Sequence, residues 1–198
     1  MLVAVQRFET LSRSEPSRSL AQRIPNEIVS EFGDSQIETV LERASGAEST
    51  VSPDKPGLIV TGLLRDDAVN VIADVRVEDG TSRKAIWSME FIRDRREAQD
   101  LPLEVAARVA DMVNMANFAR SAKPPLTNTA GLSGLLQTTD MIRDAHGGTW
   151  AQMLEKARNL VSRHPEFVFG HSVLASAYLV AADSIDIPDQ AQANRRAA

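Results

Sequence analysis

The side chains best able to do chemistry in this chain are its histidines, and their spacing argues against a metal site. His146, His164 and His171 are the only histidines in the sequence. His164 and His171 stand seven residues apart with Pro165 between them, so they do not share one helical face. No HExxH motif and no cluster of carboxylates accompanies them. We therefore interpret all three as surface or partly buried side chains, and we expect no metal and no cofactor.

A serine and two pairs of glycines are the candidates for a nucleophile and for a phosphate-binding loop. Ser133 stands in Gly-Leu-Ser-Gly, which lacks the spacing of the GxSxG nucleophile motif. Gly131 and Gly134 form a GxxG, and Gly147-Gly148 a pair. Neither follows an expected strand, and neither carries the Lys-Ser/Thr of a P-loop or a third glycine. Helix packing and a turn explain these glycines better.

Two pairs of carboxylates complete the set of candidate catalytic groups. Asp66-Asp67 and Glu78-Asp79 both fall where the pattern predicts a hairpin turn, and turn formation accounts for them. A general acid/base pair would have to face a cleft. With no other constellation in the sequence, we expect that the chain is not an enzyme.

Composition excludes several further classes. The chain has 198 residues and a formal net charge of −5, so its overall field would repel nucleic acid. The arginines at 93, 95 and 96 are interleaved with acidic residues, so we interpret this segment as a solvated loop rather than a nucleic-acid-binding patch. There is no cysteine, which excludes disulfides, thiol nucleophiles and thiolate zinc sites. No apolar run reaches the 18 residues of a membrane helix, and no signal peptide is recognisable.

The first part of the chain alternates strand and helix patterns. We expect a strand over 2–8, then a helix whose apolar residues recur every four positions from Leu20 to Phe32 and which stops at Gly33. Pro25 requires this helix to kink or to restart there. A second strand is expected over 36–41, followed by a Ser/Gly/Pro-rich loop over 44–57. 

Three more strands, over 58–64, 69–77 and 85–91, are separated by tight turns and predict an antiparallel meander. A helix is expected over 103–119, and Lys123-Pro124-Pro125 then breaks the chain. Helices follow over 129–144, 150–163 and 167–182. The predicted fold is therefore α/β (α+β), a mixed sheet with a three-strand meander flanked by helices (1–122), followed by an all-α segment (123–198).

The helical segment resembles a tetratricopeptide repeat. Leu174, Ala175, Ala177 and Tyr178 match the core of the first helix of a repeat, Pro165 precedes them at the expected distance, and Glu155-Lys156-Ala157 resembles a second helix. His171 stands where an aromatic residue is common. One to two units are present, so the segment resembles a truncated array.

The front part resembles the TolB/FlgO-like α/β domain of CadC-like and adenylate-cyclase-like bacterial regulators. The resemblance lies in Val3-Ala4-Val5-x-x-Phe8, the helix from Leu20 to Phe32, the segment Leu58 to Arg65, and Ile86-Trp87-Ser88. The departures are Gln6-Arg7 and Pro25. This resemblance implies a non-catalytic sensory or interaction domain of a transcriptional regulator, on the periplasmic side of the inner membrane. DNA binding and membrane anchoring would belong to upstream segments, and we expect the chain to be a portion of a longer protein rather than a short protein with frayed ends.

The partners that follow are a protein or a second copy of the chain, with a small-molecule signal as a further option. We place partner binding on the helical segment, at Trp150, Phe169, His171 and Tyr178, although Tyr178 fits the repeat core better. The alternative is an accessory domain of a nucleotide cyclase, or a small enzyme with an unrecognised site. A cleft with converging carboxylates and arginines would favour that alternative.

Overall fold

The computed structural model describes residues 1–12, 14–33, 37–42, 56–144 and 150–184. The chain divides into two compact units, Met1–Asn114 (unit 1) and Met115–Ala198 (unit 2). The division falls within the long helix α2 (Leu101–Ser121), whereas the sequence places the boundary after residue 122, at the Lys-Pro-Pro break. Within the described ranges, no helix combines the length and apolarity that crossing a bilayer requires.

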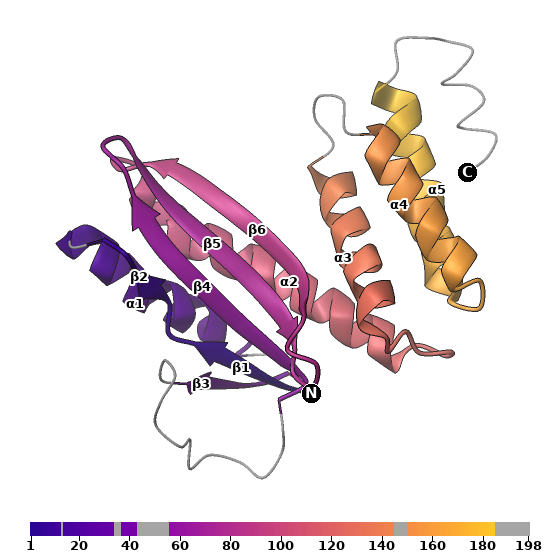
Figure 1. Ribbon diagram of the computed structural model, residues 1–198, viewed down its shortest axis with the longest axis horizontal. Helices are drawn as coiled ribbons and strands as arrows, with labels where there is room; N and C mark the ends of the chain where they lie inside the picture. The colour runs from indigo at the N-terminus through magenta and orange to yellow at the C-terminus, as the bar shows by residue number, and fades with distance from the viewer. Residues whose placement is uncertain (13, 34–36, 43–55, 145–149, 185–198) are drawn as a thin grey trace. The chain divides into compact units, whose positions relative to one another are not determined.

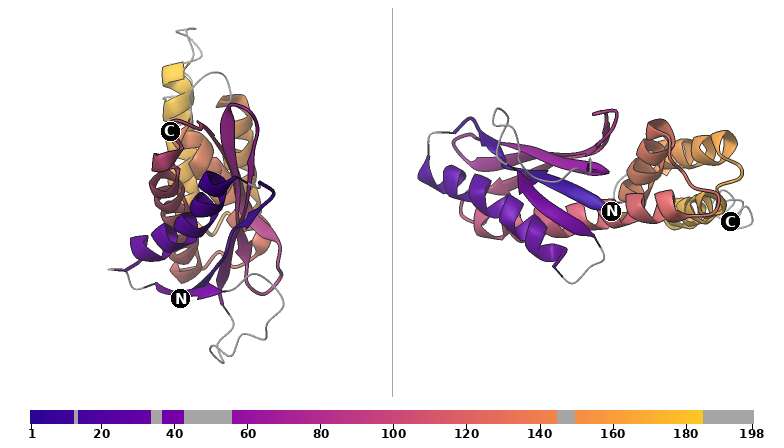
Figure 2. Two further views of the ribbon diagram at one scale, coloured as in Figure 1. Left: turned by 90° about the vertical axis from the view of Figure 1, so that its left-hand side faces the viewer. Right: turned by 90° about the horizontal axis from the view of Figure 1, so that it is seen from below.

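Unit 1 is built on a mixed six-stranded sheet with helices against one face (Figures 1 and 2). The strands are β1 (Leu2–Gln6), β2 (Glu9–Thr10), β3 (Glu38–Glu42), β4 (Leu58–Asp66), β5 (Asn70–Asp79) and β6 (Ala85–Asp94). Their order is β3-β1-β4-β5-β6, with β2 beside β4. β1 runs parallel to β3 and β4, and β4, β5 and β6 form the expected antiparallel meander. The predicted fold class is confirmed.

Helix α1 (Glu15–Glu31) shows why a proline in its middle does not end it. Its first turn is fixed by Ser14, whose hydroxyl oxygen accepts a hydrogen bond from the backbone N–H of Ser17, and by Pro16. The helix then continues through Pro25, which is itself buried. The alternative in which the helix restarts at Pro25 is therefore wrong. The buried face is the predicted one, with Leu20, Ile24 and Ile28.

The core of unit 1 lies between the sheet and the helices α1 and α2, the latter preceded by a short 3-10 helix, η1 (Ala98–Asp100). Val75, Val77 and Trp87 are at most 1% exposed on this side. Phe8 fills the space over Gly62, where an added Cβ would lie 2.2 Å from the Phe8 ring. Val69, which the alternation pattern assigned to β5, instead precedes that strand and is 58% exposed.

Unit 2 contains the end of α2 and three further helices, α3 (Thr129–Arg143), α4 (Trp150–Arg163) and α5 (Val168–Ser184) (Figure 1). α3 begins at Asn128, whose side-chain oxygen accepts a hydrogen bond from the Gly131 N–H. One core cluster joins α4 to α5 and consists of Met153, Leu154, Ala157, Ala177 and Ala181. Three of these five residues are alanines, whose small side chains leave room for close packing of two helices.

Candidate binding sites

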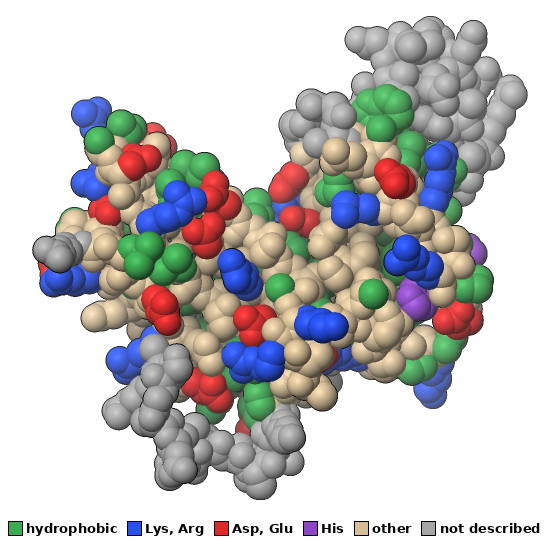
Figure 3. All heavy atoms as spheres, viewed as in Figure 1, with side chains coloured by type: hydrophobic (Ala, Val, Ile, Leu, Met, Phe, Trp, Pro, Cys, Tyr) green, Lys and Arg blue, Asp and Glu red, His purple; other side chains and the backbone are tan. Residues whose placement is uncertain are grey.

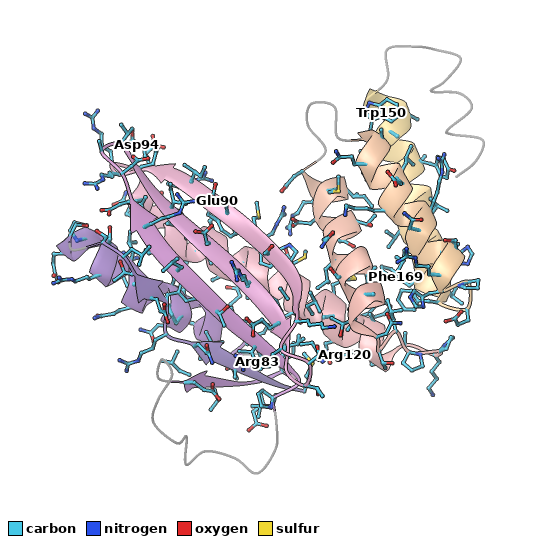
Figure 4. The ribbon with its side chains drawn as sticks, in the orientation of Figure 1. Arg83, Glu90, Asp94, Arg120, Trp150 and Phe169 are labelled. Atoms are coloured by element: carbon cyan, nitrogen blue, oxygen red, sulfur yellow. The ribbon has the colours of Figure 1, made fainter. Side chains whose placement is uncertain are left out.

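The four residues predicted to bind a partner do not come together. Trp150 and Tyr178 are partly buried and pack against the α4–α5 core cluster. Phe169 lies near the start of α5, and Figure 4 shows it at the opposite end of the α4–α5 pair from Trp150. His171 is exposed, with Nε2 3.1 Å from the carbonyl oxygen of Pro165. Trp150 and Tyr178 therefore adjoin one core cluster, whereas Phe169 lies at the other end of the helix pair.

Two of these four side chains have specific aromatic or cationic neighbours. The Tyr178 hydroxyl oxygen accepts a hydrogen bond of 3.0 Å from Arg158 Nε, and the guanidinium carbon lies 5.3 Å from the centre of the ring. Phe169 makes an edge-to-face contact of 4.9 Å with Phe118, which is 48% exposed. Tyr178 therefore contributes to packing, while Phe169 and Phe118 form an aromatic pair at the surface.

The histidines are not gathered into a metal site in the part of the chain that the structure describes. His164 Nε2 lies 3.4 Å from the Asn128 side-chain nitrogen, whereas His171 Nε2 lies near the Pro165 carbonyl oxygen. Within the described ranges, no three His, Cys, Asp or Glu side chains are placed to hold a metal ion. His146, Gly147 and Gly148 lie outside the described residues, as do residues 44–55 of the expected loop.

The explanation of Asp66 as a turn residue is wrong. Only Asp67 serves the turn, where its Oδ1 accepts hydrogen bonds from the backbone N–H groups of Val69 and Asn70, and these bonds lower the pKa of Asp67. Asp66 ends β4, and its Oδ2 accepts from the hydroxyls of Ser14 and Ser17, each at 3.0 Å.

The Asp66 carboxylate also receives a hydrogen bond of 2.7 Å from Arg95 Nη2. Hydrogen bonding from Ser12, and then from Ser14 and Ser17, together with the positive charge of Arg95, keeps the pKa of Asp66 below its usual value. Ser14 is also the cap of α1, so this carboxylate ties the start of the helix to the end of a strand. Sequence spacing could not reveal this contact, because Asp66 lies 52 positions from Ser14.

The face of the sheet away from the helices carries a shallow hollow of about 430 Å³ with charges of both signs. Its lining includes Glu9, Asp74, Arg76, Glu78 and Arg83. Two of these carboxylates are already paired. Asp74 accepts a hydrogen bond from Arg65, which also pairs with Glu90, and Glu78 lies 3.2 Å from Arg83 (Figure 4). Asp74 and Glu78 are therefore each neutralised by a neighbouring arginine.

A second hollow, of about 320 Å³, lies between α3 and α4 and is here named the α3–α4 groove. Its lining is Ala130, Gly131, Ser133, Gly134 and Gln137 of α3, and Lys156, Asn159, Leu160, Arg163 and His164 at or just after α4. It contains basic and neutral side chains but no carboxylate. Figure 3 shows basic side chains and a histidine over these helices. The sequence pattern alone predicts no binding role for Gly131, Ser133, Gly134 and His164.

The third candidate is the outer face of α5, defined by Val168, Ser172, Ala175 and Leu179. These positions follow the spacing i, i+4, i+7 and i+11, which places them on one side of a helix. Val168 is 70% exposed and Leu179 is 50% exposed. On the opposite side of α5, Val173, Ala177 and Ala181 are buried. α5 thus presents apolar residues both to the core and to the surface.

Comparison with known proteins gives no family for this chain. No family model matches it, and no curated protein matches it. Among solved structures, it is similar to the hypothetical protein CT253 from Chlamydia trachomatis, at 16% identity and a TM-score of 0.40, over 56% of this chain and 96% of that one. It is also similar to the PelC dodecamer from Paraburkholderia phytofirmans, at 12% identity and a TM-score of 0.35, over 53% and 79% of the two chains. Likeness at this level supports no statement about function.

Proposed function

We propose that this chain is a non-catalytic protein-interaction module of a bacterial regulator, and that a second copy of the chain docks on the outer face of α5. One observation carries the proposal. α5 is apolar on two opposite sides, yet only one of them is packed, and Val168 and Leu179 remain exposed on the other. Exposed apolar residues at helical spacing are typical of a surface that receives another helix.

The spacing of the outer face fits a second α5 in the antiparallel direction. If a two-fold axis passes between residues 173 and 174, Val168 lies opposite the partner's Leu179, and Ser172 lies opposite the partner's Ala175. Each contact then occurs twice, as two-fold symmetry requires. The residues nearest the axis on this face are small, so two helices could approach to about 8–10 Å. The resemblance to bacterial regulators agrees with a domain that associates rather than catalyses.

Sedimentation equilibrium of the whole chain over a range of concentrations tests the proposal. We expect a reversible monomer–dimer equilibrium, because a single helix pair buries less surface than a permanent interface. Leu179→Glu and Val168→Glu should each shift the chain to monomer, since either places two charges in an apolar contact. Leu103→Glu changes a leucine of similar exposure outside this face and is the matched control. A monomer at every concentration, or equal effects of all three variants, would overturn the proposal.

A second candidate, a small enzyme or cyclase accessory domain, is favoured by the hollow on the open face of the sheet, where arginines and carboxylates meet. Screening of small polar compounds by NMR tests it. Saturable shifts confined to the amides of Thr61, Leu63 and Arg76 would support a ligand site there. Shifts spread over the surface would remove this candidate, because the internal ion pairs would then account for the charges.

A further inference from the structure

The α3–α4 groove combines features that the interaction surface on α5 does not use. It lies on a different pair of helices and is lined by Lys156, Arg163 and His164 with no carboxylate. The chain as a whole carries a net charge of −5, so a lining without acidic side chains differs from the composition. The Glu166 carboxylate, outside the lining, lies 3.8 Å from His164 Nδ1, which leaves Lys156 and Arg163 as the cations of the groove. Its volume of about 320 Å³ is at the small end of the range found for ligand pockets.

Two glycines of α3 shape the groove in different ways. At Gly131 an added Cβ would lie 2.6 Å from Leu126 Cδ1 and 2.9 Å from His164 Nε2, so this glycine lets the imidazole approach the helix backbone. At Gly134 an added Cβ would meet only Leu160 Cδ1, at 4.0 Å. Packing therefore does not require a glycine at 134, although glycine is unfavourable inside a helix. Its effect is to leave the groove open.

The polar side chains along the groove are held by one another. Lys156 Nζ donates a hydrogen bond of 2.8 Å to Gln137 Oε1, and Gln137 Nε2 donates one of 2.9 Å to Ser133 Oγ. This relay fixes the ammonium beside α3 and leaves the Ser133 hydroxyl hydrogen available as a donor. The Arg163 guanidinium makes no hydrogen bond or ion pair with any residue that the structure describes.

We propose that the α3–α4 groove binds the phosphate group of a small phosphate monoester. Lys156 and Arg163 supply two positive charges, which match the charge of about −1.5 to −2 that a monoester carries at pH 7. Its three oxygens can accept from the ammonium, the guanidinium, the Ser133 hydroxyl and the side-chain amide of Asn159. A carboxylate has two oxygens and a single charge, so it would leave some of these donors without an acceptor.

The test is a titration of the full chain, followed by ¹⁵N–¹H NMR, with inorganic phosphate, AMP, acetate and chloride at constant ionic strength. We expect saturable shifts at the amides of Gly131, Ser133 and Gly134 with phosphate and AMP. Acetate should bind at least about tenfold more weakly, because it has one charge fewer. Saturation by AMP but not by adenosine would assign the binding to the phosphate group.

Two variants and one control complete the experiment. Lys156→Gln together with Arg163→Gln should weaken phosphate binding at least about tenfold. Gly134→Leu should block the groove and abolish binding without loss of helical circular dichroism. Arg23→Gln removes an exposed arginine of unit 1 and should change nothing at the groove. Shifts that never saturate, equal binding of acetate, or binding that survives both groove variants would overturn the proposal. None of these outcomes depends on whether the chain dimerises.

Discussion

Replacement of Asp66 by alanine tests the contact that joins α1 to the sheet. The carboxylate is only 10% exposed and accepts hydrogen bonds from Ser14, Ser17 and Arg95. Without it, the hydroxyl of Ser17, a residue that is 1% exposed, loses its long-range acceptor. Asp67 is the matched control, because its side chain accepts exposed hydrogen bonds from backbone N–H groups within its own β4–β5 turn and does not reach α1.

The cost can be estimated from these contacts. A hydrogen bond to a charged group contributes about 1.5–3 kcal/mol, and contributions within one network are not additive. The Arg95 side chain is 44% exposed, so its ion pair adds only about 0.5 kcal/mol. We therefore expect Asp66→Ala to lower the free energy of unfolding of unit 1 by about 3 kcal/mol. Asp67→Ala should cost clearly less, because its carboxylate and the backbone groups that it accepts from are exposed to solvent.

Urea unfolding monitored by tryptophan fluorescence measures the difference. Trp87 is 1% exposed in unit 1, and Trp150 lies in unit 2, so Trp150→Phe as background leaves Trp87 to report on unit 1. With a slope of about 1.5–2 kcal/mol per M, Asp66→Ala should lower the urea midpoint by about 1.5–2 M. Equal midpoints for the Asp66 and Asp67 variants would refute the role assigned to Asp66.

The contribution of Asp66 to the free energy of unfolding should depend on pH, and comparison of the parent chain with Asp66→Ala measures it. The folded-state pKa of Asp66 lies below its ordinary value of 3.8, so the unfolded chain takes up a proton first as the pH falls. The stabilisation from Asp66 is therefore fully present well above pH 3.8 and is lost as the pH falls through the folded-state pKa. The stability difference between the parent and Asp66→Ala should be constant near neutral pH and shrink below about pH 4. A difference that grows on acidification would show that the sign is wrong.

Two further substitutions test the packing of the two units. Gly62→Ala should destabilise unit 1 by about 1–3 kcal/mol, because the new Cβ would lie 2.2 Å from the Phe8 ring. In a double-mutant cycle measured by urea unfolding, a smaller residue at position 8 should reduce this penalty. Gly134→Ala should stabilise unit 2 by about 1 kcal/mol in thermal unfolding, because the added Cβ has room and alanine favours the helix. A loss of stability would show that position 134 is more tightly packed.

The elements of this fold were largely predictable because their apolar residues recur at strand and helix periods. The meander could be derived from alternation and from the turn residues near Asp67 and Gly80. The continuity of α1 through Pro25 could not be derived from the sequence, because it depends on the burial of the helix on both sides of the proline. The exposure of Val69 was missed for a similar reason. Val69 has the right spacing but stands one position outside β5, because pairing with the partner strand begins at Asn70.

The candidate sites were less predictable, because they depend on contacts between distant segments. Asp66 looks like its neighbour Asp67 in sequence, and only the approach of Ser14 and Ser17 separates their roles. Gly134 looks like a packing glycine until the space around it is known. The spacing of Val168 and Leu179 was visible in the sequence, but their exposure was not. Trp150 and Tyr178 were predicted as binding residues because they are aromatic, but both pack against the core cluster.

Cysteine cross-linking tests the pairing of α5 most directly, because the natural chain contains no cysteine. Chains carrying Ser172→Cys are mixed with chains carrying Ala175→Cys and oxidised, and the disulfide-linked heterodimer is quantified by mass spectrometry. The antiparallel pairing predicts that this mixture cross-links rapidly, whereas chains carrying Ser88→Cys, on the exposed part of β6, do not. Cross-linking no faster than with Ser88→Cys would contradict the claim that a second copy docks on the outer face of α5.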